Sequence, residues 1–165
     1  MGYRRLAGWL LCLFCLGASP VRAAGPVAEM RPFVAGSLAR IVSAHQGKPF
    51  LLGFWSLDCV HCGAEMQLLK KLKARHPGLD VVLVATDANE DWSNLQAHLQ
   101  AAGLGRVEQW AFADPVPERL RQEIDRRWYG ELPRTYLYGR DGEVTAISGL
   151  LSEAALAPWL VRNKP

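Results

Sequence analysis

Two cysteines, Cys59 and Cys62, stand two residues apart between an apolar run and a segment with helical spacing. The run at residues 50–55 is apolar throughout, which is typical of a central strand covered on both faces. Met66 and Leu69 continue a helical pattern after the second cysteine. A thiol at the N-terminus of a helix is stabilised as its thiolate, and a second thiol almost one turn further on can close a disulfide. This arrangement predicts redox chemistry.

The first residues have the pattern of a secretory signal peptide. Arg4 and Arg5 precede an apolar stretch at 6–16, and the small-x-small sequence 21–23 fits a cleavage site after Ala23. The apolar stretch is about a dozen residues long, short of the roughly 20 that span a bilayer, so a membrane anchor is the less favoured alternative. We therefore expect residues 1–23 to be a signal peptide and the protein to work in the periplasm.

Removal of residues 1–23 would leave a formally neutral chain, because three of the 19 basic residues leave and the 16 acidic residues stay. No basic stripe remains for nucleic acid, so we expect no nucleic-acid partner. Cys12 and Cys15 would leave with the leader, so a four-cysteine zinc site is excluded by counting. We expect no metal and no cofactor. A structural or metal-binding pair is the alternative to a redox-active disulfide at Cys59 and Cys62.

The two cysteines are expected to divide the work of disulfide exchange. Exchange needs an exposed thiolate that attacks and a second thiol that resolves the mixed disulfide. Cys59 comes directly after the strand–helix turn and is the predicted nucleophile. Cys62 is expected to face inward and to resolve.

The rest of the chain predicts one α/β domain. Residues 24–36 are expected to form an extended lead-in, and residues 37–165 the domain itself. One short helix is predicted to begin at residue 37, and the other predicted helices cover 59–75, 91–102, 117–128 and 152–161. The predicted strands cover 50–55, 80–86, 109–113, 134–138 and 143–147. Asp141-Gly142 is a strong hairpin signal between the last two strands. The order predicts a sheet that mixes parallel and antiparallel strands.

Several motifs together resemble the thioredoxin fold, and more narrowly the exported TlpA/ResA-like thiol-disulfide oxidoreductases, which include the cytochrome c maturation reductases. They are Gly47-Lys48-Pro49, Phe54-Trp55, Cys59-x-x-Cys62, Glu65 three residues further on, and the run 132–137. The resemblance covers about residues 33–162. It implies a central mixed sheet flanked by helices, with a β-hairpin after a cis-proline.

The resemblance also implies roles for residues around the cysteine pair. Glu65, one helical turn beyond Cys62, would exchange a proton with that cysteine, and burial would raise its pKa toward the working range. Pro133 would be the cis-proline whose backbone receives the substrate strand. Leu132 and Trp55 would border the substrate groove, and Trp55 would also shield the disulfide.

Two residues are expected to tune the pKa of the thiols in opposite directions. His61, between the cysteines, would stabilise the thiolate and make the pair more oxidising. Asp58 would disfavour a second negative charge beside Cys59, or would cap the helix. The family pattern usually has Trp where this chain has Asp58, and its proline near the motif is absent here.

The expected function is reduction of disulfides in client proteins. The resemblance points to apocytochrome c or a copper-protein precursor as client, and to a membrane electron donor that re-reduces the pair. One alternative is a dithiol oxidase or isomerase, which His61 favours. Another is a Cu(I)-delivery module that binds metal through Cys59 and Cys62.

Overall fold

The computed structural model describes residues 26–88 and 91–164; the predicted signal peptide, residues 1–23, lies outside these described residues. Within them lie six strands and five helices. In chain order they are β1 (Met30–Phe33), α1 (Ser37–Ala44), β2 (Phe50–Trp55), α2 (Cys62–Arg75), β3 (Asp80–Ala85), α3 (Trp92–Ala101), β4 (Glu108–Phe112), α4 (Pro117–Ile124), β5 (Arg134–Tyr138), β6 (Val144–Ser148) and α5 (Glu153–Arg162).

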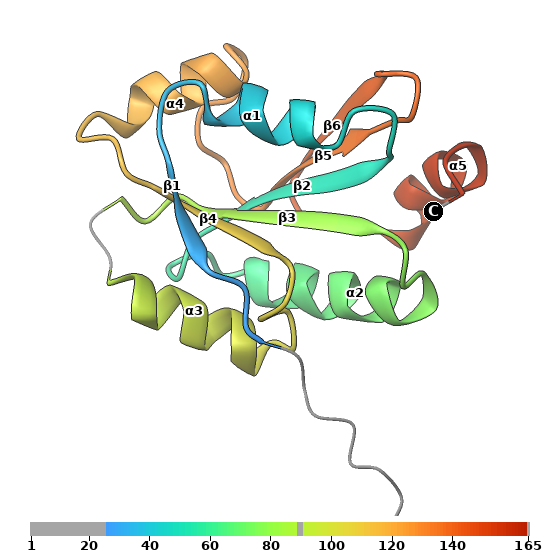
Figure 1. Cartoon of the computed structure of the whole chain (residues 1–165), viewed down its shortest axis with the longest axis horizontal. Coiled ribbons are helices and arrows are strands. Elements are labelled where there is room, and N and C mark those ends of the chain that lie inside the picture. Colours follow the sequence, from blue (N-terminus) through green and yellow to red (C-terminus); the bar gives the residue numbers. More distant parts are fainter. Residues whose placement is uncertain (1–25, 89–90, 165) are drawn as a thin grey trace, which may run out of the picture.

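The strands form a single mixed sheet in the order β1-β4-β3-β2-β5-β6. The first four are mutually parallel, whereas β5 runs antiparallel to both β2 and β6. Helices α2 and α3 cover one face of the sheet, and α1 and α4 cover the other (Figure 1). Helix α5 adds Leu156 and Trp159 to the core on the α2 side. The predicted fold class, including the β-hairpin, is confirmed.

Strand β2 is central and buried along its whole length. Leu51 and Trp55 point into the core beneath α2, and Phe50, Leu52 and Phe54 point into the core on the opposite face. This alternation is that of a strand with two covered faces, as the unbroken apolar run predicts. The strand therefore fixes the turn that follows it at the carboxyl edge of the parallel strands.

The structure differs clearly from the sequence prediction at three elements, whereas the other predicted boundaries agree to within one residue. Strand β1 lies within the expected lead-in and pairs in parallel with β4. Helix α2 begins at Cys62, three residues later than predicted. Helix α4 ends at Ile124, short of the predicted residue 128, because Asp125 is extended and its carboxylate accepts a hydrogen bond from the Arg127 amide.

None of the helices between residues 26 and 88 or between 91 and 164 has the length and apolar character needed to cross a bilayer.

Candidate active site

The cysteine pair forms a disulfide in the turn between β2 and α2. The two sulfurs are 2.02 Å apart and the Cα atoms 5.4 Å apart. The Cys59 amide donates to the Ser56 carbonyl, and the Cys62 amide to the Cys59 carbonyl, each at 3.2 Å. Both hydrogen bonds span three residues, as in a tight turn, so the α-helix begins only at Cys62. The prediction that Cys59 is the first helical residue is therefore wrong.

The two sulfur-bearing residues differ in exposure. Cys62 is 2% exposed and belongs to the core, whereas Cys59 is half-buried and lies beside Val60, which is 89% exposed. Cys59 is thus the cysteine that a protein disulfide could reach. The geometry suits the predicted division into an attacking and a resolving thiol.

Glu65 lies on the first turn of α2 and is only 4% exposed. The Thr135 hydroxyl donates to its Oε1 at 2.5 Å, and the Leu151 amide donates to its Oε2 at 3.0 Å. Burial raises the pKa of the Glu65 carboxyl above its usual value, against the lowering effect of these two hydrogen bonds. Glu65 is therefore a buried group and not an exposed first-turn carboxylate that only interacts with the helix dipole.

Four predicted site residues line one small cavity behind the disulfide: Trp55, Cys62, Glu65 and Pro133. Its volume is about 10 Å³, close to that of one water-sized sphere. The Leu132–Pro133 peptide bond is cis, as predicted. Pro133 is buried in the lining of this cavity, whereas Leu132 is half-buried and packs against both cores.

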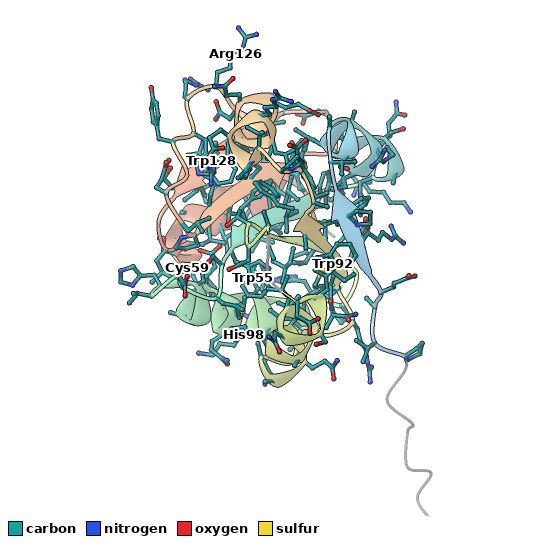
Figure 2. All side chains as sticks on the ribbon, turned by 90° about the vertical axis from the view of Figure 1, so that its left-hand side faces the viewer. Trp55, Cys59, Trp92, His98, Arg126 and Trp128 are labelled. Atoms are coloured by element: carbon teal, nitrogen blue, oxygen red, sulfur yellow. A yellow bond between two sulfur atoms is a disulfide. The ribbon has the colours of Figure 1, made fainter. Side chains whose placement is uncertain are left out.

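Trp55 lies on the buried side of the disulfide, where it was expected to shield the pair, and not at the rim of a groove. It is 3% exposed, and its indole ring stacks on His98 of α3, with ring centroids 5.3 Å apart. Figure 2 views the end of the molecule that carries Cys59, with Trp55 on the side of His98. Trp55 therefore backs the buried side of the disulfide and does not rim an open groove.

Asp58 and His61 flank the pair on the surface, and both side chains are exposed. The residue that precedes α2 is His61, and the helix has no side-chain cap. Asp58 therefore does not cap the helix; its amide donates to the Ser56 hydroxyl at 3.1 Å. The predicted effects of these two residues on the thiols stay predictions.

Asp87, which the sequence analysis did not single out, holds the turn in place. Its Oδ1 accepts the Ser56 hydroxyl at 2.9 Å and the Leu57 amide at 3.2 Å. The available signal was its position, since Asp87 follows the predicted strand that neighbours β2. Parallel strands bring such residues to one edge of the sheet.

A charged network that was also missed supports the loop before the cis-proline. Arg134, 7% exposed, pairs with Asp125 at 2.8 Å and with Glu131 at 3.4 Å. Glu131 also accepts the Tyr129 amide at 3.1 Å and the Ser148 hydroxyl at 2.8 Å. This network joins the end of α4 and the edge strand β6 to the loop. In the part of the chain that the structure describes, no three His, Cys, Asp or Glu residues are grouped as metal ligands.

The chain is similar in sequence to a known thiol-disulfide oxidoreductase. No protein-family model matches the chain. The thiol-disulfide oxidoreductase ResA from Halalkalibacterium halodurans is 27% identical over 121 residues, which are 73% of this chain and 65% of ResA. The match thus spans just under two thirds of the length of that relative.

Solved structures show the same fold. A secreted disulfide oxidoreductase from Mycobacterium tuberculosis, homologous to E. coli DsbE, superposes with a TM-score of 0.57 at 23% identity, over 72% of this chain and 84% of that one. StoA from Bacillus subtilis gives 0.53 at 19% identity, over 69% and 83%. A thiol:disulfide interchange protein from Chlorobium tepidum gives 0.59 at 18%, over 75% and 85%. The chain has a thioredoxin-like fold. In this thioredoxin-like domain the cysteine pair, the cis-proline and the buried glutamate converge at one edge of the sheet.

Proposed function

We propose that this protein is a periplasmic thiol-disulfide oxidoreductase that reduces disulfides in client proteins through Cys59 and Cys62. The observation that carries the proposal is the disulfide whose one cysteine is accessible and whose other cysteine is buried against Glu65. The similarity to ResA and to secreted disulfide oxidoreductases supports it.

In the reduced protein, the Cys59 thiolate attacks one sulfur of the client disulfide. A mixed disulfide forms, and the other client sulfur leaves as a thiolate. Glu65 then accepts the proton of Cys62, through the small cavity that both residues line. The resulting Cys62 thiolate attacks Cys59, the second client sulfur leaves, and the Cys59–Cys62 disulfide remains. Two electrons have passed from the protein to the client.

The return to the dithiol needs a reductant. We propose a membrane electron donor, a haem- or copper-protein precursor such as apocytochrome c as client, and export through a signal peptide cleaved after Ala23. The exposed Val60 and the half-buried Leu132 would meet the client chain, and the backbone at Pro133 would receive it.

Two measurements test the proposal: one gives the direction of electron flow, and the other identifies the residue that attacks the client disulfide. The reduction potential of the pair, measured in glutathione and dithiothreitol buffers, should lie nearer to the about −270 mV of thioredoxin than to the about −120 mV of DsbA. Cys59→Ser should abolish reduction of insulin disulfides, while the surface variant Glu118→Gln should retain it. A DsbA-like potential would reverse the direction of electron flow. Full activity of Cys59→Ser would overturn the site.

A further inference from the structure

Thr135 is fully buried and lies at the junction of the cis-proline loop and β5. It faces Gly53 across the β2–β5 pair. A Cβ atom at residue 53 would lie 3.0 Å from the Leu83 side chain and 4.0 Å from the Thr135 hydroxyl. The glycine therefore leaves room for the Leu83 side chain beside Thr135. The Thr135 hydroxyl in turn donates to Oε1 of Glu65.

The second oxygen of Glu65 binds another loop that borders the disulfide. Its Oε2 accepts the Leu151 amide in the segment between β6 and α5. Two residues earlier, the Gly149 amide donates to the Pro133 carbonyl at 2.9 Å. Pro133, Thr135, Glu65, Leu151 and Gly149 thus form a closed circuit of backbone and hydrogen bonds, with the Glu65 carboxyl as its link.

The two donors to Glu65 differ in what they tolerate. A hydroxyl both donates and accepts, whereas a backbone N–H only donates. When Glu65 is ionised, Thr135 donates to Oε1, as observed. When Glu65 is protonated, a proton on Oε1 can be donated to the Thr135 oxygen after the hydroxyl rotates. Oε2 keeps its lone pairs for the Leu151 amide, so both oxygens of Glu65 keep a hydrogen-bond partner in either state.

We propose that Thr135 is the positioning residue for proton transfer: its hydroxyl holds the Glu65 carboxyl in both protonation states, directs the transferred proton to Oε1 and ties the proton acceptor to the cis-proline loop. The proposal rests on the proposed function of Glu65 as the partner of Cys62.

Few other titratable or charged residues lie near Glu65 in the cavity, so Thr135 is the side chain that can hold its carboxyl. Apart from Glu65, the titratable residue among those lining the cavity is Cys62. The residues of β2 and β3 that line the cavity are uncharged: Gly53, Phe54, Trp55 and Leu83. Arg134, adjacent to Thr135 on β5, points to the other face of the sheet, where it pairs with Asp125.

Thr135→Val and Thr135→Ser separate the hydroxyl from the shape of the residue. Valine keeps the volume and removes the donor to the carboxylate, so the charged form of Glu65 loses support and its titration should move to higher pH. Serine keeps the hydroxyl and should titrate close to the wild type. The measurement is an NMR titration of the Glu65 carboxyl in the oxidised protein, with Glu65→Gln to assign the signal.

The rate of the resolving step should follow the same order. Below the Glu65 midpoint, Thr135→Val should resolve the mixed disulfide more slowly than the wild type, and Thr135→Ser should restore the rate. An unchanged Glu65 titration in Thr135→Val would overturn the proposal. The titration needs no turnover, so its outcome does not depend on whether Glu65 accepts the proton of Cys62. That role of Glu65 is excluded instead if Glu65→Gln resolves the mixed disulfide at the wild-type rate.

Wild-type protein supplies a second test in case Thr135→Val does not fold. The NMR signals of the Thr135 side chain should shift with the midpoint of Glu65 and should stay constant in Glu65→Gln. Thr135 signals that do not shift over the pH range of the Glu65 titration would contradict the proposal.

Discussion

Exposure separates two side chains of the same type at this site. Cys59 is half-buried, and Cys62 is almost completely enclosed by the core. The order could be predicted from the sequence, because a residue in a turn precedes one that faces inward from a helix. The setting of Glu65 could not be predicted fully, since its partner Thr135 is 70 residues away along the chain.

Replacement of Glu65 by Gln should slow the resolving step. The amide cannot take the proton from Cys62, and loss of a general base typically costs about a hundredfold in rate. Stopped-flow measurement of mixed-disulfide decay over a range of pH checks this. The wild type should lose rate as pH falls and Glu65 is protonated, whereas Glu65→Gln should lack that dependence. Equal rates for the two proteins would exclude Glu65 from proton transfer.

The turn between β2 and α2 is held by the side chain of Asp87, which lies in the loop after β3. Asp87→Ala should leave the Ser56 hydroxyl and the Leu57 amide without their acceptor and should lower the free energy of unfolding by about 1–2 kcal/mol. Asp87→Asn keeps an acceptor oxygen and should lose less. Urea unfolding of the oxidised proteins measures both, and a larger loss in Asn than in Ala would contradict the assigned hydrogen bonds.

Strand β4 carries a buried polar side chain whose replacement by an apolar one should stabilise the protein. The Gln109 side chain is fully buried, and neither its nitrogen nor its oxygen has a hydrogen-bond partner among the described residues. Gln109→Met has a similar shape and should raise the free energy of unfolding by about 1–3 kcal/mol, because two buried polar atoms are removed. The exposed Gln67→Met serves as control, and a destabilised Gln109→Met would refute the prediction.

Elements with a clear local sequence pattern were predicted closely. Elements that form because of their tertiary partners were not. Strand β2 coincides with the predicted run 50–55, and β5 with 134–138. Strand β1 carries Arg31 and Pro32 and is a strand because β4 pairs with it. The amphipathic spacing suggested that α4 continues to Trp128, but this residue packs on the core from a loop.

At the scale of the molecule, buried Glu65 makes stability depend on pH. Its pKa is raised in the folded protein, so between the usual value of 4.5 and the raised one the folded state binds more protons than the unfolded state. Its contribution is therefore fully present below about pH 4.5 and is lost as pH rises through the folded pKa. Glu65→Gln should remove this loss.

Urea unfolding of both proteins between about pH 4 and about pH 8 checks the sign, because the difference between them isolates Glu65. The wild type should lose stability relative to Glu65→Gln as pH rises. The opposite slope would mean that Glu65 is better stabilised as an anion in the folded state than in the unfolded state.

The topology explains why the site forms where it does. The turn after β2 and the loop after β3 lie at the same edge of the sheet because the two strands are parallel. Antiparallel β5 starts at that edge and so brings Pro133 to the disulfide. This convergence followed from the predicted order of elements, whereas the contacts of Asp87 and Arg134 depend on side-chain positions that spacing does not encode.

Trapping the mixed disulfide tests the central claim most directly. Reduced Cys62→Ala should accumulate a covalent complex with a disulfide-bearing protein such as insulin, because no second thiol resolves it. Mass spectrometry should locate the bond at Cys59. Reduced Cys59→Ala should accumulate none, since Cys62 is buried. A complex through Cys62, or no complex from Cys62→Ala, would contradict disulfide exchange with Cys59 as the nucleophile.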